Sequence, residues 1–264
     1  MMSVRDRAEY PRVDVLGVGI SAINMSMAVD QVTRWIDNAG PSRYVCVTGV
    51  HGVMESQRDR DLMRIHNESG MTTPDGMPMV WAGHRAGAAW MDRVYGPDLM
   101  LEILSHGLAR GWKSFLYGGK EGVVDLLRTK LVERFPKVQI VGTHTPPFRE
   151  LTPEEDDNVL AEIDSSGADI VWVGLSTPKQ EKWMADHVGR TRATVMFGVG
   201  AAFDFHAGVK AQAPRWIQRS GLEWSYRLVH DPRLIARYAV NNPAFVWRIL
   251  RRPPTLLRPL APKA

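Results

Sequence analysis

Asp75 is the carboxylate of this sequence best suited to act as a general base. It stands between Pro74 and Gly76 in a polar, turn-rich segment that covers residues 72–78. Because the proline ring fixes one backbone angle, the segment is expected to hold Asp75 in a defined place, which a proton acceptor in catalysis requires. Aspartate in such a segment more often only forms the turn, and the residues by themselves leave both interpretations open.

Two glycines, Gly118 and Gly119, lie where a strand predicted over residues 114–117 turns into a helix. Glycine lets backbone amides approach an anion closely, and the N-terminus of the following helix attracts phosphate. No Gly-Lys-Ser or Gly-Lys-Thr follows, so the turn is not a nucleoside triphosphatase loop. Diphosphate binding and an ordinary tight turn are the two interpretations that remain.

Three polar residues, Lys179, Gln180 and Glu181, follow a strand predicted over residues 169–175. Doubly wound sheets bind ligands at the carboxyl ends of their strands, so these side chains are placed to contact a ligand. The alternative is an ordinary charged first turn of a helix that begins at Pro178.

Gly17 and Gly19 begin a G-x-G-x-x-A pattern, which binds dinucleotides when it connects a strand to a helix. A strand predicted over residues 13–20 supplies that context. The fingerprint also needs an acidic residue at the end of the second strand, but that strand, predicted over residues 44–50, ends without one. Asp37 has the right separation but falls on the intervening helix. An NAD-dependent oxidoreductase therefore ranks as an alternative function.

Residues that bind metals or form disulfides are sparse. The eight histidines show no H-E-x-x-H or paired spacing, and Cys46 is the one cysteine. Asp59-Arg60-Asp61 imitates a metal-binding D-x-D, but it falls in a helix predicted over residues 53–67, where a solvated face is the better interpretation. We therefore predict no metal and no other cofactor. The lone cysteine and the lack of a signal peptide pattern favour the reducing cytoplasm.

The elements that must position these residues alternate along the chain. Short apolar runs predict strands, and segments with apolar residues three and four apart predict helices between them. The repeated order predicts an α/β fold, with a doubly wound, mostly parallel sheet covered by helices on both faces. Thr152, Pro153 and Glu155 have the pattern of a capping box at a helix start. Strands are expected at residues 13–20, 44–50, 114–117, 138–143, 169–175 and 194–199, and two of the helices at residues 98–110 and 122–135.

Beyond Asp204 the pattern changes to short basic helices. No strand-like run follows, and prolines interrupt the segment. The net charge of the chain is +4, but residues 206–264 hold eleven Lys and Arg against two acidic residues. We therefore predict two domains, an α/β domain over residues 1–205 and a basic helical appendage over residues 206–264.

Arginines alternate with aromatic residues in this appendage. Such basic helices suit a membrane interface, where arginines contact lipid phosphates. An ordinary surface helix packed through its aromatic residues is the alternative. Nucleic acid ranks lower, because no recognition helix, zinc finger or RNA-binding signature is present. The candidate arginines are Arg215, Arg219, Arg227, Arg237, Arg248, Arg251 and Arg252.

Ordered motifs along most of the chain carry a resemblance to a known family. They are Thr73-Pro-Asp-Gly-Met-Pro, Arg93-Val-Tyr-Gly-Pro-Asp-Leu-Met, Tyr117-Gly-Gly, Val173-Gly-Leu-Ser-Thr-Pro-Lys-Gln-Glu-Lys-Trp-Met, Gly198-Val-Gly-Ala-Ala-Phe-Asp-Phe, Ala213-Pro-Arg-Trp and Gly221-Leu-Glu-Trp-Ser-Tyr-Arg-Leu. From about residue 13 to residue 250 the chain resembles the WecG/TagA/CpsF family of bacterial glycosyltransferases, glycosyltransferase family 26. The resemblance implies a Rossmann-like fold with a membrane-associating appendage, a UDP-sugar donor and a polyprenyl-diphosphate-linked sugar acceptor. Typical members transfer N-acetylmannosamine to lipid-linked N-acetylglucosamine.

The resemblance also assigns roles to residues. It implies that Asp75 is the catalytic base and that Thr48 lies at the donor site, where the family commonly has Thr-x-Asn and this chain has Thr48-Gly49-Val50 followed by His51. The expected reaction is the inverting transfer of a hexose or N-acetylhexosamine, with N-acetylmannosamine favoured, from its UDP donor. Residues expected to bind substrate are Gly118, Gly119, Arg93, Asp98, Lys179, Gln180, Glu181, Gly200 and Asp204.

The expected partners follow from this reaction. They are the UDP-sugar, the polyprenyl-diphosphate-linked acceptor and the anionic inner surface of the plasma membrane, and they do not include nucleic acid. The chain is expected on the cytoplasmic face as a peripheral protein, and its oligomeric state stays open, a homo-oligomer included. The alternative functions are an NAD-binding oxidoreductase and a non-catalytic lipid- or nucleic-acid-binding module.

Overall fold

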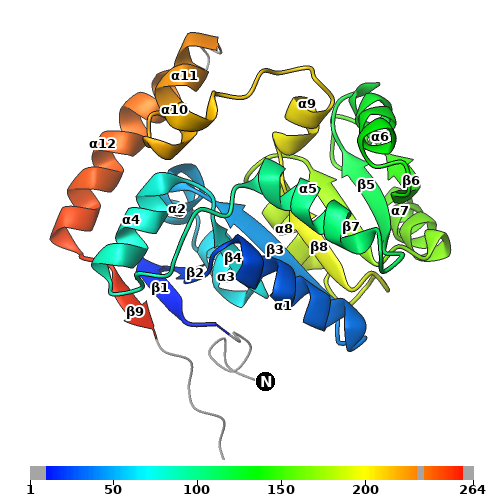
Figure 1. Ribbon diagram of the computed structural model, residues 1–264, viewed down its shortest axis with the longest axis horizontal. Helices are drawn as coiled ribbons and strands as arrows, with labels where there is room; N and C mark the ends of the chain where they lie inside the picture. Colours follow the sequence, from blue (N-terminus) through cyan, green and yellow to red (C-terminus); the bar gives the residue numbers. More distant parts are fainter. Residues whose placement is uncertain (1–9, 231–234, 258–264) are drawn as a thin grey trace, which may run out of the picture. The chain divides into compact units, whose positions relative to one another are not determined.

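A computed structural model describes residues 10–230 and 235–257 of the chain (Figure 1). The chain forms two compact units, each assembled from segments that are distant in the sequence. The first unit contains the described residues up to 25, residues 47–95 and the described residues from 212 onward; the second contains residues 26–46 and 96–211. The C-terminal segment therefore shares a unit with the N-terminal residues, and this division differs from the predicted boundary between residues 205 and 206.

The second unit is built on a parallel sheet, as the alternating pattern predicts. Its strands lie in the order β3-β8-β7-β5-β6, and each neighbouring pair is parallel. On the other side of β3 the sheet order continues to β4, a strand of the first unit. The bounds are β3 (Arg43–Thr48), β4 (Met71–Pro74), β5 (Lys113–Gly118), β6 (Gln139–His144), β7 (Ile170–Gly174) and β8 (Val195–Gly198).

Helices flank this sheet and confirm the α/β prediction. In Figure 1 α1 and α5 lie in front of the sheet and α8 lies behind it, while α9 packs against α5 and α6. The predicted capping box is present at the start of α7, where Thr152 Oγ1 accepts from the Glu155 amide (3.2 Å) and Glu155 Oε2 accepts from the Thr152 amide (2.9 Å). The bounds are α1 (Met25–Asp37), α5 (Gly96–Gly107), α6 (Val123–Arg134), α7 (Pro153–Ser166), α8 (Lys179–His187) and α9 (Ala202–His206).

The first unit begins with an antiparallel hairpin, so the prediction of one strand over residues 13–20 is wrong. Strands β1 (Arg12–Val15) and β2 (Val18–Ser21) are joined by Leu16 and Gly17, whose φ angles of 56° and 92° are those that tight hairpin turns require. The amides of Gly17 and Gly19 donate to Asp14 Oδ1 (2.5 Å) and Asn67 Oδ1 (2.8 Å). The glycines therefore turn a hairpin and do not start a phosphate-binding helix, which removes the structural context of the NAD alternative.

A further strand, β9 (Thr255–Leu257), pairs with β1 and completes a sheet with the order β2-β1-β9. The prediction that no strand follows residue 204 is therefore wrong. The predicted helix over residues 53–67 is two helices, because Asp59 caps the second one by accepting from the amides of Asp61 and Leu62. The helices of this unit are α2 (Val50–Ser56), α3 (Arg60–Glu68), α4 (Met77–Arg85), α10 (Arg215–Arg219), α11 (Glu223–His230) and α12 (Ile235–Arg251).

The apolar core of the first unit ties its N- and C-terminal segments together. Hairpin residues such as Val13 and Ile20 are fully buried and belong to the same cluster as Met79 of α4 and Phe245 of α12. Helix α12 also packs against α2. Because Phe245 is 4% exposed, α12 forms part of this core and does not stand apart as a separate appendage.

A buried arginine fixes the segment that leads into β4. Arg12 donates to the carbonyls of His66 (3.2 Å), Asn67 (3.3 Å) and Ser69 (2.5 Å), at the C-terminal end of α3. A cation is favourable there because the helix dipole places partial negative charge at this end. The contact orders the turn between α3 and β4, and β4 leads directly to Asp75.

Candidate active site

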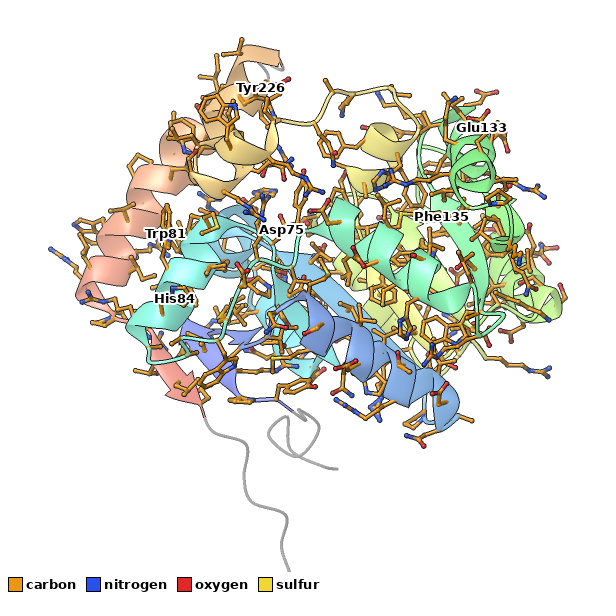
Figure 2. The ribbon with its side chains drawn as sticks, viewed as in Figure 1. Asp75, Trp81, His84, Glu133, Phe135 and Tyr226 are labelled. Carbon is orange, nitrogen blue, oxygen red and sulfur yellow. The ribbon has the colours of Figure 1, made fainter. Side chains whose placement is uncertain are left out.

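Asp75 lies in the short connection between β4 and α4, at the N-terminal end of α4 (Figure 2). Its backbone N–H donates to the Thr48 carbonyl at the end of β3 (3.2 Å), and its own carbonyl accepts from Arg93 Nε (2.5 Å). These two backbone contacts fix the position from which the carboxylate projects. A Cβ on Gly49 would lie 3.7 Å from Asp75 Oδ2, so a glycine at this position keeps side-chain atoms away from that side of the carboxylate.

Arg93 belongs to a charged network that joins its loop to α11. Its Nη2 is ion-paired with Glu223 Oε2, and its Nη1 lies 3.3 Å from the backbone and side-chain oxygens of Gln218. Glu223 Oε1 accepts from Arg227 Nη2 (2.6 Å) and from the Tyr95 hydroxyl (3.1 Å). The Arg93 guanidinium also lies 4.0 Å from the centre of the Tyr95 ring, within cation–π distance. Two guanidinium groups thus share one carboxylate, which leaves these side chains with excess positive charge.

The network holds its members in fixed protonation states. Burial acts to raise the pKa of Glu223, but Arg227 and Arg93 lower that pKa below its usual value. Burial acts to lower the pKa of Arg227, but Glu223, Tyr95 and Asp75 are among the groups that raise it above its usual value. Burial also raises the pKa of Tyr95, so the phenol keeps its proton. Because Asp75 contributes to two of these shifts, its carboxylate lies within the electrostatic reach of the network.

Two threonines in neighbouring strands next to Asp75 have buried hydroxyl groups. Thr48 Oγ1 at the end of β3 and Thr73 Oγ1 in β4 have no hydrogen-bond partner among the residues that the structure describes. Buried polar atoms are nearly always hydrogen-bonded, so an exception calls for an explanation. A ligand hydroxyl is one partner that would complete the hydrogen bonding of Thr48, for which the family resemblance predicts a place at the donor site.

In the second unit, three neighbouring strands end in glycine, namely Gly118 of β5, Gly174 of β7 and Gly198 of β8. A Cβ on Gly118 would lie 2.8 Å from the Gly174 backbone, and one on Gly174 would lie 2.7 Å from the Phe203 ring. The Gly119 amide donates to the Gly174 carbonyl (3.0 Å). Of the two amides expected to contact a diphosphate, that of Gly119 is therefore already bound within the protein.

Gln180 and Glu181 lie in the first turn of α8 and are 3% and 0% exposed. Glu181 Oε1 accepts from Gln180 Nε2 (3.0 Å) and from Thr177 Oγ1 (2.9 Å). Burial raises the pKa of the Glu181 carboxyl above its usual value, against the opposing effect of these hydrogen bonds. When Glu181 carries a proton on Oε2, its Oε1 still accepts both hydrogen bonds.

The other substrate-binding candidates of the second unit have different surroundings. Lys179 is exposed at the start of α8, with Nζ 5.1 Å from the centre of the Phe148 ring. Asp98 lies in the first turn of α5, and Asp204 of α9 is ion-paired with Lys210 (2.6 Å). Within the described residues no hydrogen bond joins Asp98 or Asp204 to the pair formed by Gln180 and Glu181. Gly200 follows β8 with a φ of 49° and lies beside Gln180.

The candidate arginines of the C-terminal segment have different surroundings. Arg227 belongs to the network around Glu223, and Arg248 is half-buried in α12. Arg237 also lies in α12, but its side chain is outside the described part of the chain. The exposed members are Arg215, Arg219, Arg251 and Arg252.

In each unit, candidate residues contact side chains for which no role was predicted. Tyr95, Thr177 and Glu223 each contact a candidate residue, yet none was predicted to have a role. Glu223 had a signal, since it is one of two acidic residues in a strongly basic segment. Tyr95 and Thr177 had only their places inside the quoted motifs.

The structure shows no candidate metal site in the part of the chain that it describes. In residues 10–230 and 235–257, no three His, Cys, Asp or Glu side chains are grouped so that they could hold a metal ion. The prediction that the protein uses no metal stays a prediction.

A parallel α/β sheet with polar side chains at the carboxyl ends of its strands, together with a fixed carboxylate in a charged network, is typical of enzymes. Residues 13–258 match the sequence model of the family described as "Glycosyl transferase WecG/TagA/CpsF family". The chain belongs to this family of glycosyltransferases.

Two similar curated proteins carry the same name. Two proteins from Staphylococcus aureus strains MW2 and NCTC 8325 are each called N-acetylglucosaminyldiphosphoundecaprenol N-acetyl-beta-D-mannosaminyltransferase. Each is 28% identical to this chain over 251 residues, which cover 95% of this chain and 96% of the relative. The similarity therefore spans both units of the structure.

Proposed function

We propose that this protein transfers a hexose or N-acetylhexosamine, with N-acetylmannosamine favoured, from a UDP-sugar to a sugar linked to polyprenyl diphosphate. The names of the relatives support the acceptor and the favoured sugar. The observation that carries the proposal is the setting of Asp75, whose backbone is fixed by Thr48 and Arg93 and whose carboxylate faces the glycine at position 49.

The proposed reaction is a single inverting displacement. Asp75 accepts the proton of the acceptor hydroxyl while that oxygen attacks the anomeric carbon of the donor sugar. The bond from this carbon to the diphosphate oxygen breaks, and UDP leaves from the opposite face with the electron pair. The carboxylate becomes a carboxylic acid and returns its proton to solvent. Charge that develops on the diphosphate needs positive groups around it.

The ligand that stabilises the protein tests the nucleotide class. We expect UDP to raise the melting temperature and NAD to leave it unchanged, because the hairpin at Gly17 lacks the dinucleotide-binding turn. A ligand at one hundred times its dissociation constant stabilises a protein by about 2.7 kcal/mol. Differential scanning fluorimetry with UDP, ADP and NAD measures the effect, and ADP controls for the base. An NAD shift larger than the UDP shift would favour the oxidoreductase instead.

We also propose that α12 docks on the anionic inner surface of the plasma membrane. One face of this helix carries exposed apolar side chains at the three- and four-residue spacing of a helical stripe, whereas Asn241 and Phe245 on the other face are buried. Exposed Arg251 at the end of α12 borders the stripe, and its guanidinium lies 3.9 Å from the centre of the Trp247 ring. Arg252, the next residue, is ion-paired with Asp14 (2.8 Å). The exposed apolar residues are Ile235, Ala239, Val240, Pro243, Val246, Trp247 and Leu250. No helix in the described part of the chain is long and apolar enough to cross a bilayer.

Replacing Trp247 and Leu250 by glutamate is expected to weaken binding to anionic liposomes by at least tenfold. These side chains are 54% and 68% exposed, so the change removes apolar contact with lipid and leaves the core intact. Co-sedimentation at low and high salt measures binding. High salt should weaken the binding of the parent only in part, because the arginine contribution is screened and the apolar one is not.

A matched control is the double replacement of Leu126 and Val132 by glutamate on α6. These side chains are 40% and 42% exposed, respectively. This variant should bind liposomes as the parent does. Equal binding by the α12 variant and the parent would contradict the docking proposal.

A further inference from the structure

Gln180 has a side-chain amide whose two ends have different surroundings. Its Nε2 donates to Glu181 Oε1, whereas its Oε1 is buried and has no hydrogen-bond partner among the described residues. Because Glu181 accepts at Oε1, the amide is held with its nitrogen toward Glu181 and its oxygen away from it. The buried oxygen is therefore a fixed acceptor that lacks a donor.

Gly200 lies beside this oxygen. A Cβ on Gly200 would lie 3.3 Å from Gln180 Oε1 and 3.8 Å from the Ser176 Cα. The φ of 49° at this position also favours glycine. A side chain at position 200 would crowd the acceptor oxygen, and glycine avoids this contact.

The surroundings favour a neutral hydrogen-bond donor over an anion. The Gln180 amide donates to the Ser176 carbonyl (3.0 Å) and the Lys182 amide to the Pro178 carbonyl (3.2 Å), so these amides of the first turn are already bound. The other end of the same amide is hydrogen-bonded to the carboxyl of Glu181, which disfavours an anion beside it. A hydroxyl or N–H group would satisfy the Gln180 oxygen.

The Glu181 side chain is 0% exposed. Its Oε1 accepts from both Gln180 and Thr177, whereas its Oε2 is also buried and has no hydrogen-bond partner among the described residues. Thr177 lies just before the helix, and its hydroxyl donates to the same carboxyl oxygen as the Gln180 amide group. The carboxyl therefore acts on the orientation of Gln180.

We propose that Gln180 Oε1 accepts a hydrogen bond from a hydroxyl or N–H group of the sugar nucleotide, and that Glu181 is a positioning residue that, held by Thr177, keeps the amide in this orientation. The inference rests on the proposed function, because it takes the sugar nucleotide as the ligand. Both residues were predicted to bind substrate; in this proposal Gln180 contacts the ligand and Glu181 orients Gln180. The donor group lies either on the nucleotide or on the transferred sugar.

A double-mutant cycle separates positioning from direct contact. The variants are Gln180→Ala, Glu181→Met and the double variant, and methionine keeps the size of glutamate without an acceptor. Donor KM and kcat are measured together with calorimetric binding of UDP and of UDP-N-acetylmannosamine. Gln180→Ala is expected to raise donor KM about tenfold with a smaller change in kcat, as expected for the loss of one hydrogen bond to a buried acceptor.

Glu181→Met should raise donor KM about fivefold in the parent and leave it unchanged in the Gln180→Ala background. Glu181→Gln, which retains an acceptor, should fall between the parent and Glu181→Met. The control is Gln31→Ala, which removes another buried glutamine of the same unit and should lower the melting temperature without changing donor KM. If Gln180→Ala lowers the affinity for UDP, the contact is to the nucleotide. If it lowers the affinity for the UDP-sugar alone, the contact is to the sugar.

Two results would overturn the inference while the proposed function stands. One is a parent that binds the donor and a Glu181→Met effect of the same size in both backgrounds. The other is an unchanged donor KM in Gln180→Ala. A parent that binds neither UDP nor the UDP-sugar would instead overturn the proposed function, and the inference with it.

Discussion

Replacing Asp75 by asparagine is expected to lower turnover by about 10² to 10⁴, the range that removal of a general base produces. Asparagine keeps the size of the side chain but accepts no proton at neutral pH. The backbone contacts to Thr48 and Arg93 do not involve the carboxylate, so they persist in the variant. The acceptor hydroxyl would then attack with its proton still bound. Initial rates at saturating donor and acceptor measure the effect.

The fold and the nucleotide affinity of the Asp75→Asn variant should match those of the parent. Asp61→Asn is a matched control in the same unit, since Asp61 is 56% exposed and pairs only with a surface arginine in the described contacts. Its turnover should stay at the parent value. Turnover of Asp75→Asn within threefold of the parent would refute the assignment of Asp75 as the base.

Removing Arg93 is expected to impair both stability and turnover. The Arg93 and Glu223 side chains are 11% and 13% exposed, and breaking such a pair leaves a buried carboxylate with less compensation. The loss in the free energy of unfolding should be on the order of 3 kcal/mol for Arg93→Ala, reduced to the extent that Arg227 still pairs with Glu223. Loss of the bond to the Asp75 carbonyl frees the base to shift, and a misplacement of about 1 Å costs on the order of 10² in rate. Urea unfolding and initial rates measure the two effects.

Two variants show whether this effect depends on the network. Arg93→Lys keeps the charge but cannot reach Asp75, Gln218 and Glu223 together, so its turnover should lie between those of Arg93→Ala and the parent. Arg64→Ala removes an arginine that is 55% exposed and paired with Asp61 and Glu68, and it should cost less than about 1 kcal/mol. Arg93→Ala with parent turnover would show that the network does not position Asp75.

The parallel sheet could be predicted from sequence because its strands are short apolar runs between helices with clear periodicity. The hairpin could not, since residues 13–20 form one nearly continuous apolar run and the pattern alone does not show the reversal at Leu16 and Gly17. Strand β9 has three residues and follows two prolines, so it gives too little pattern for a prediction. Its strand conformation depends on pairing with β1, which is a tertiary effect.

The features of the candidate site residues could also be predicted only in part. Proline and glycine on either side of Asp75 made its local rigidity predictable. The partners of Arg93 were not predictable, because Glu223 is 130 residues away and only the fold brings the two together. The separate roles of Gln180 and Glu181 depend on which atoms pair inside the second unit, and adjacent polar residues in a sequence carry no such information.

The identity of the product is the most direct test of the proposed function. Purified protein is incubated with a panel of UDP-sugars and a lipid diphosphate that carries N-acetylglucosamine, and the products are analysed by mass spectrometry and NMR. The proposed function predicts that the acceptor gains one hexose or N-acetylhexosamine and that one UDP is released per transfer. It also predicts that the new bond has the anomeric configuration opposite to that of the donor. Transfer with retention of configuration, or no transfer from any UDP-sugar by a folded protein, would contradict it.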